Sequence, residues 1–247
     1  KTTLGHLASM YNAQSGHTNS VTLLRQRELA RSRREFLARG SRVKRCTDCM
    51  LAKSLCMCSS RPAPSGVVAV CLVYYQGEVF KPSNTGRLVA DVLADNHAFL
   101  WHRTEPDPEM LAIVQREDYA PLVIFPYNYA APERHMKDDE TLQRYLAGRK
   151  PLLIFLDGTW REARKMFRSS WLANYPVIAI EPTQASNYRL REAFHEHQLG
   201  TAEVAIDILQ RMGERQCADN LSTYFELFKD RYLAGRANHF TTDDSVN

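Results

Sequence analysis

The feature that most constrains this chain is a continuous apolar run at residues 152–156 that stops abruptly at Asp157 and Gly158. An unbroken apolar run of this length is typical of a strand buried on both faces of a parallel sheet. Helical spacing follows at once in Trp160, Ala163, Arg164 and Phe167. The segment therefore predicts a strand, a tight turn and a helix. Open α/β sheets bind their ligands at the carboxyl ends of the strands, which is where this turn lies.

Two interpretations of the turn are open. In the first, Asp157 or Thr159 caps the following helix and Trp160 belongs to the core, as is usual after a strand. In the second, the turn carries chemistry, with Asp157 as its ionisable group.

The rest of the chain predicts an α/β domain whose mostly parallel sheet is flanked by helices. Further strands are expected at residues 67–74, 98–102, 121–125 and 177–180. Helices are expected at residues 21–38, 87–93, 110–116, 138–146 and 221–233, and one more begins at Gly200. The loops at 126–129, 157–160 and 181–191 then meet at one edge of the sheet, which predicts a ligand cleft there.

The loop before residue 87 offers helix caps in Ser83, Asn84 and Thr85, and Gly86 allows close approach of a ligand. Arg87 places a cation in the first turn of a helix, where it opposes the macrodipole. Either a salt bridge with a neighbour or an anionic ligand would compensate.

Four cysteines lie within thirteen residues, at Cys46, Cys49, Cys56 and Cys58. Neighbouring thiolates repel one another, and tetrahedral metal coordination relieves that repulsion. The spacing predicts a zinc site, with an iron–sulfur cluster or free thiols as the alternatives. Because cysteine fills all four positions, the metal is expected to be structural.

Positive charge is concentrated near the amino terminus. Residues 25–45 contain nine basic and two acidic side chains, a net +7, so the total of +4 leaves −3 for the remainder. Such a run is either a solvated helix face or, beside a cysteine cluster, a surface for nucleic acid. The chain has no apolar run of membrane-span length and no signal-peptide apolar region, so we expect a cytoplasmic protein that does not bind membranes. Nothing in the sequence indicates a protein partner.

Composition divides the chain into three parts. We expect a basic, partly helical extension at residues 1–42, a zinc-binding segment at 43–62, and a catalytic domain at 63–247.

Several motifs resemble those of the DTW-domain family. They are the Asp-x-Thr-Trp turn at 157–160 followed by Ala163 and Met166, the Lys-Pro-Ser-Asn-Thr-Gly-Arg-Leu loop at 81–88, the segment 188–192, and the CxxC and CxC pair. Members of that family are tRNA-uridine aminocarboxypropyltransferases. The resemblance implies transfer of the 3-amino-3-carboxypropyl group of S-adenosylmethionine to N3 of a uridine in tRNA, with release of methylthioadenosine. It favours the tRNA variable loop and implies a SPOUT-like, trefoil-knotted sheet.

The resemblance also suggests roles for individual residues. Asp157 is expected to act as general base or to hold the donor's amino group, and Arg87 to pair with the donor's carboxylate or an RNA phosphate. The donor is expected to contact Ser83, Asn84, Thr85, Gly86, Phe125, Pro126, Leu156, Gly158, Thr159, Trp160, Tyr188, Arg189, Thr201 and Glu203. Glu203 has capping as its alternative, and Trp160 could stack on the donor or wall it off. An RNA methyltransferase that uses S-adenosylmethionine and a non-catalytic zinc-containing RNA-binding protein remain alternative functions.

Overall fold

A computed structural model of the chain describes residues 17–32, 43–179 and 200–243, with side chains described as far as residue 236. Its described strands form one parallel sheet in the order β2-β1-β4-β3-β5. Their bounds are β1 Ser65–Tyr74, β2 Leu93–Leu100, β3 Tyr119–Ile124, β4 Lys150–Asp157 and β5 Val177–Ile178. The α/β prediction is confirmed, and the run that opened the sequence analysis is the central strand, β4.

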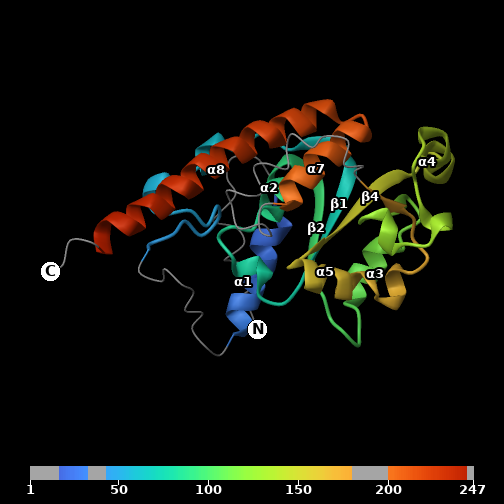
Figure 1. Cartoon of the computed structure of the whole chain (residues 1–247), viewed down its shortest axis with the longest axis horizontal. Helices are drawn as coiled ribbons and strands as arrows, with labels where there is room; N and C mark the ends of the chain where they lie inside the picture. Colours follow the sequence, from blue (N-terminus) through green and yellow to red (C-terminus); the bar gives the residue numbers. More distant parts are fainter. Residues whose placement is uncertain (1–16, 33–42, 180–199, 244–247) are drawn as a thin grey trace, which may run out of the picture.

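The strands are buried on both faces because helices cover both. The helices are α1 Ser20–Arg31, α2 Gly86–Val92, α3 Pro108–Val114, α4 Asp139–Leu146, α5 Trp160–Phe167, α7 Gly200–Arg211 and α8 Arg215–Asp243. Side chains alternate along a strand, so Val70 and Leu72 of β1 join the core beneath α1, α2, α7 and α8. Cys71 and Val73 join the opposite core beneath α3 and α5. Figure 1 shows α7 and α8 on one side of the sheet and α3 and α5 on the other.

Four element boundaries differ from the predicted ones by five residues or more. Strand β2 starts at Leu93 rather than at residue 98, because α2 passes directly into the strand and the polar stretch after Leu93 lies on a sheet edge. Helix α1 ends at Arg31 rather than at 38, since Ser32 is extended. Helix α8 begins at Arg215 rather than at 221, after a turn at Gly213 with φ of 82°, and it continues to Asp243 rather than ending at 233.

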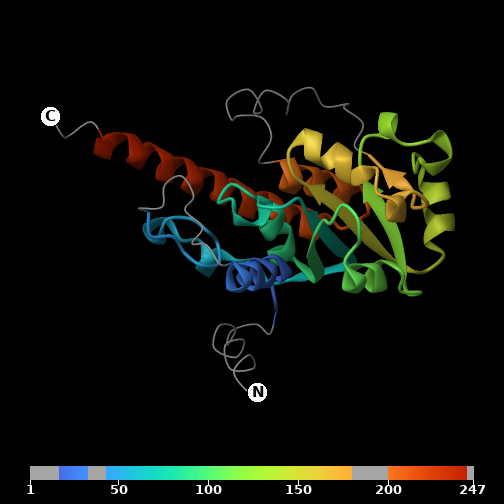
Figure 2. The same cartoon turned by 90° about the horizontal axis from the view of Figure 1, so that it is seen from below.

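The cysteine segment packs on the same core as the sheet. Cys49, Leu51 and Met57 are buried in one cluster with Val21 and Leu24 of α1. Helix α8 contacts the short helix Lys53–Leu55, and Figures 1 and 2 both show this segment beside α8. Among the described helices, none has the length and apolar character that crossing a membrane requires.

Candidate active site and metal centre

Asp157 is the last residue of β4 and lies opposite Tyr74, the last residue of β1. Its side chain is only 7% exposed and makes two hydrogen bonds with residues distant in sequence. Asn84 Nδ2 donates to Oδ1 at 2.9 Å, and Thr201 Oγ1 donates to Oδ2 at 2.9 Å. One carboxylate thus joins the strand end, the 81–85 loop and the first turn of α7.

Burial raises the pKa of Asp157 to about 6, because desolvation disfavours its charged form. The hydrogen bond from Thr201 opposes this rise, the charge of Glu78 adds to it, and the hydrogen bond from Asn84 also opposes it. The carboxyl group therefore changes ionisation just below neutral pH, in the range expected for a general base.

The capping interpretation of Asp157 is wrong, because Thr159 is the cap. The Thr159 hydroxyl accepts from the backbone N–H of Glu162, and the Glu162 carboxylate accepts from the Thr159 N–H at 2.8 Å. This capping box satisfies the start of α5 without the aspartate. Trp160 is 40% exposed, so it is not a core residue either.

The 81–85 loop is held in place by Asn84. Its Oδ1 accepts from the Tyr74 hydroxyl at 3.3 Å and from the Gly86 N–H at 3.1 Å, while its amide donates to Asp157. A Cβ on Gly86 would lie 2.2 Å from the Tyr74 hydroxyl oxygen and 3.2 Å from Asp157 Oδ2. Only glycine fits at this position, because side chains fill the space around it.

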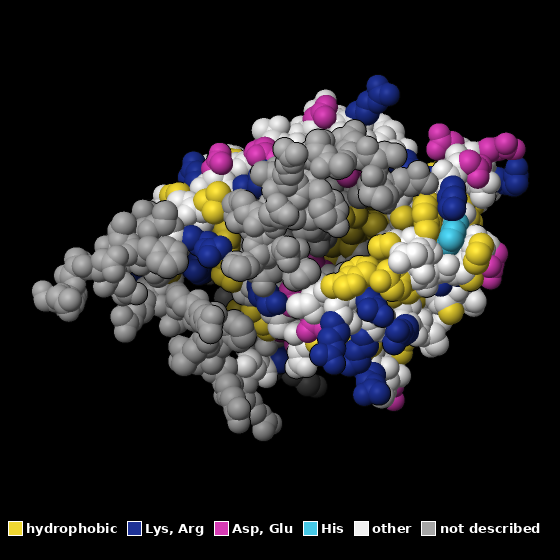
Figure 3. Space-filling model, in the orientation of Figure 1, with side chains coloured by type: hydrophobic (Ala, Val, Ile, Leu, Met, Phe, Trp, Pro, Cys, Tyr) yellow, Lys and Arg dark blue, Asp and Glu magenta, His cyan; other side chains and the backbone are white. Residues whose placement is uncertain are grey.

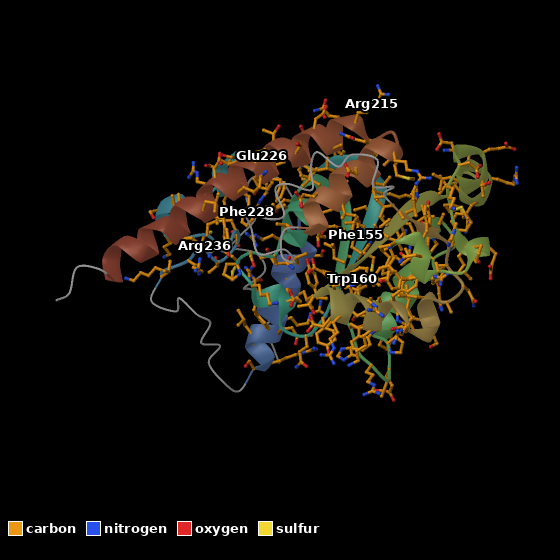
Figure 4. The ribbon with its side chains drawn as sticks, viewed as in Figure 1. Phe155, Trp160, Arg215, Glu226, Phe228 and Arg236 are labelled. Atoms are coloured by element: carbon orange, nitrogen blue, oxygen red, sulfur yellow. The ribbon has the colours of Figure 1, made fainter. Side chains whose placement is uncertain are left out.

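Arg87 is 2% exposed and lies under the same loop. Its Nη1 donates to the carbonyl oxygens of Pro82 at 3.1 Å and Asn84 at 2.5 Å, and its guanidinium lies over the ring of Phe228, at 4.9 Å. Figure 4 shows Phe228 on α8. Burial lowers the pKa of Arg87. Among the described residues no carboxylate forms a salt bridge with Arg87, and its Nε and Nη2 are buried without hydrogen-bond partners.

The other predicted donor contacts that the structure describes fall into three groups. Ser83, Asn84 and Thr85 are buried around the loop, and the Thr85 hydroxyl accepts from the Ala202 N–H of α7 at 3.2 Å. Gly86, Gly158, Thr159 and Thr201 lie at or beside the Asp157 carboxylate, and Phe125, Pro126, Leu156, Trp160 and Glu203 lie at neighbouring strand or helix ends. Tyr188 and Arg189 lie outside the described residues.

Sequence reasoning missed Tyr74, Glu78 and Lys81. Tyr74 is fully buried, and burial raises its pKa well above the usual value. Glu78 is also buried and forms an ion pair with Lys81. The available sequence signal was the position of Tyr74 at the end of the predicted strand 67–74, where parallel sheets bind their ligands. A shallow depression between α1, β2 and α3, lined in part by Arg27, His97 and Glu109, includes none of the predicted site residues.

The four cysteines form a site that fits a metal ion. Their sulfur atoms all lie within 4.8 Å of one another, with Cys46 to Cys58 at 3.6 Å and Cys49 to Cys56 at 3.8 Å. Zinc–sulfur bonds of about 2.3 Å in a tetrahedron set neighbouring sulfurs about 3.8 Å apart. Sequence spacing and geometry thus agree on one four-thiolate centre.

The surroundings of the cysteines also suit a negative centre. The carbonyl of Cys46 accepts from the Met50 N–H at 3.1 Å, which closes the first cysteine turn, and Met50 takes a left-handed φ of 61°. Arg25 and Arg87 are both buried close enough to interact electrostatically with Cys49. Two buried cations offset the net charge of −2 that four thiolates and a divalent zinc would carry.

The described part of the basic segment is only partly exposed. Arg25 is 3% exposed, and Arg31 pairs with Glu28 at 3.3 Å. Most of the remaining arginines, at 33, 34, 39 and 42, lie outside the described residues.

Comparison of the sequence with known protein families identifies the family of this chain. The sequence profile of the DTW domain matches residues 43–233, a span that includes the cysteine segment, the Asn84 loop, Asp157 and α7. No solved structure matches the chain. The match covers well over half of the sequence and includes both the Asp157 site and the four-cysteine site. The chain therefore belongs to the DTW-domain family.

Proposed function

We propose that this protein transfers the 3-amino-3-carboxypropyl group of S-adenosylmethionine to N3 of a tRNA uridine and releases methylthioadenosine. Membership of the DTW-domain family supports a tRNA-modifying role. The observation that carries the specific chemistry is Asp157, a buried carboxylate at a strand carboxyl end with a pKa of about 6. N-alkylation of uridine requires removal of the N3 proton, and this carboxylate is suited to accept it.

The proposed reaction is a single displacement. The N3–Cγ bond forms while the Cγ–S bond breaks, the bonding pair stays on sulfur as a neutral thioether, and the N3 proton moves to Asp157. The sulfonium supplies a good leaving group, so the protein mainly orients the two reactants, an effect that contributes several kcal/mol. Asn84 and Thr201 fix both carboxylate oxygens and so set the direction from which a proton reaches them.

We assign donor binding to the residues around this carboxylate. The 83–86 loop, the start of α7 with Thr201 and Glu203, and the 125–126 and 156–159 segments would hold it, together with Tyr188 and Arg189 from outside the described residues. Arg87 is proposed to act through the loop, because its guanidinium holds the carbonyls of Pro82 and Asn84. It is thus a positioning residue for Asn84 and, through Asn84, for the base.

The remaining assignments complete the proposal. The four cysteines bind a structural zinc that anchors residues 43–62 against α8, and the basic segment at 25–45 contributes phosphate contacts to tRNA. A four-thiol site is best maintained in a reducing compartment, which supports a cytoplasmic location. We also propose a SPOUT-like trefoil knot. The parallel direction of all described strands is consistent with that fold.

Mass spectrometry of nucleosides tests the reaction directly. Purified protein, unmodified tRNA and S-adenosylmethionine are incubated together, and the tRNA is then digested. We expect uridine carrying an aminocarboxypropyl group, with an equal amount of methylthioadenosine. A methylated nucleoside with S-adenosylhomocysteine would assign the chain to the methyltransferases instead. The absence of any adduct, despite tRNA binding, would support a non-catalytic RNA-binding role.

A further inference from the structure

Three aromatic rings, that of Phe125 and those of the first and last residues of α5, form a stack whose outer ring is exposed. Phe125 lies nearly parallel to Phe167, at 4.2 Å and 8°, and nearly parallel to Trp160, at 5.5 Å and 10°. Phe125 and Phe167 are buried, whereas Trp160 is 40% exposed. Tyr129 meets the edge of Trp160 at 5.3 Å and is 38% exposed. Figure 4 shows Trp160 at the start of α5, near Phe155 of β4.

A stripe of basic side chains runs along α5 from this stack. Exposed Arg161, Arg164, Lys165 and Arg168 are spaced by three, four and seven residues, which places them on one face of the helix. Glu162, the one acidic residue of α5, is used in the capping box. Figure 3 shows Lys and Arg side chains gathered beside a hydrophobic patch where α5 lies in Figure 1.

The stripe has aromatic rings along it. Arg164 lies over the ring of Tyr129, at 5.3 Å. Lys165 lies over Tyr75 at 5.6 Å and over Trp101 at 5.3 Å, and these two rings stack on each other at 5.5 Å. Within the described residues, the guanidinium groups of Arg161 and Arg168 form no hydrogen bond or ion pair with the protein. Their charges are therefore directed to solvent or to a partner.

We propose that this surface, the α5 face, binds a single-stranded segment of RNA, with an unpaired base stacked on Trp160 and phosphates on the basic stripe. The α5 face comprises Tyr129, Trp160, Arg161, Arg164, Lys165 and Arg168. The choice of RNA rests on the proposed function, and the α5 face deepens that function by placing the strand that carries the target uridine. Aromatic platforms beside basic side chains are the usual means of binding unpaired nucleic acid.

The chemistry favours RNA over other anionic partners. A flat base continues a near-parallel ring stack, whereas an acidic peptide would satisfy the charges and leave the exposed indole uncovered. The location also fits, because Trp160 is three residues from the proposed base Asp157. A strand held on α5 can therefore present its neighbouring uridine at the end of β4.

Fluorescence anisotropy with a labelled oligouridine RNA of about ten nucleotides tests the α5 face. The full-length protein is titrated at several KCl concentrations, without S-adenosylmethionine. Replacing Trp160→Ala should weaken binding at least about fivefold, the loss expected for one stacked base, and leave the salt slope unchanged. Trp160→Phe should retain part of the affinity, because it keeps a ring.

Removing positive charges from the α5 face should, in contrast, change the salt dependence of binding. Arg161→Gln together with Arg168→Gln removes two phosphate contacts. The slope of log affinity against log salt is negative, and it should become less negative by about 1.4, since each contact contributes about −0.7 for single strands. The matched control, Arg215→Gln with Arg236→Gln, removes two exposed charges from α8 and should leave that slope as in the wild type.

Three outcomes would overturn the proposal. The first is wild-type RNA affinity in both Trp160→Ala and the α5 double variant. The second is a loss of S-adenosylmethionine affinity in Trp160→Ala with RNA binding unchanged, which would make Trp160 a wall of the donor site. The third is that polyglutamate displaces the labelled RNA as effectively as unlabelled RNA does, which would indicate that the surface recognises negative charge alone. Binding that follows the expected pattern without any transfer to tRNA would leave the α5 face standing and refute only the proposed reaction.

Discussion

Replacing Asp157→Asn should make the protein more stable at neutral pH while slowing its activity at least about a hundredfold. The wild-type carboxylate is ionised and buried above its pKa of about 6, so folding at pH 8 includes a desolvation penalty. The difference from the ordinary 3.8, at about 1.36 kcal/mol for each pH unit, makes that penalty about 3 kcal/mol. Asparagine has no charge to desolvate.

The asparagine side chain can also keep both hydrogen bonds. Its oxygen still accepts from Asn84 Nδ2, and its new amide can donate to the Thr201 hydroxyl, which can accept as readily as donate. No buried polar atom is left unpaired by the change. The expected gain is therefore not cancelled by a lost contact.

The pH dependence has a definite sign. A carboxyl group with a raised folded pKa binds more protons in the folded state, so the wild type loses stability as pH rises from about 4 through about 6. The advantage of the variant should be about 3 kcal/mol at pH 8 and about 1.6 kcal/mol at pH 5. Asp219→Asn, at an exposed carboxylate of α8, serves as the matched control and should be nearly neutral throughout.

Urea unfolding at pH 5, 6, 7 and 8 measures these differences, and transfer assays at the same pH values measure activity. We expect a variant that is more stable at pH 8 yet transfers the group at least about a hundredfold more slowly, because an amide cannot accept the N3 proton. A variant that is less stable than wild type at pH 8, or equally active, would refute the reasoning about a buried ionised base.

The remaining predictions concern the support of this site and the metal. Thr201→Val removes a hydrogen bond that favours ionised Asp157, so the pH at which activity is half-maximal should rise in a pH–rate profile. Gly86→Ala should destabilise the fold by a few kcal/mol through its clash with the Tyr74 hydroxyl, and Tyr74→Phe should relieve part of that loss in a double-mutant cycle. Elemental analysis should find one zinc per chain, and Cys49→Ala should lose it and lower the Tm, since Cys49 is buried in the core; iron, or undiminished zinc in the variant, would contradict this.

Much of the fold follows from local sequence, and the β4–α5 unit shows why. A buried parallel strand needs an unbroken apolar run, and a helix start needs a cap. The strand, turn and helix of residues 152–167 can therefore be predicted from that segment alone. The cysteine centre could likewise be predicted from local sequence, because four cysteines at such close spacing are typical of a metal site. In contrast, β2 begins within a polar stretch that is extended only because it pairs with β1.

The candidate site was only partly predictable because its contacts are distant in sequence. Asp157 and the 83–86 loop were found from strand ends and motifs, but the bonds from Asn84 and Thr201 to one carboxylate depend on register and helix placement. The exposure of Trp160 had no local signal, since an aromatic residue at a helix start is usually core. The burial of Arg87 was likewise hidden, because only the packed α8 reveals the ring beneath its guanidinium.

The central claim, transfer of the aminocarboxypropyl group with Asp157 as base, is tested most directly with two labelled forms of S-adenosylmethionine. One form carries its label in the carboxyl group and the other in the methyl group, and each is incubated with tRNA and either the wild type or Asp157→Asn at pH 7.5. We expect the wild type to place only the carboxyl label in tRNA, and the variant to place at least about a hundredfold less in the same time. Methyl label in the tRNA, or full incorporation by the variant, would contradict the account.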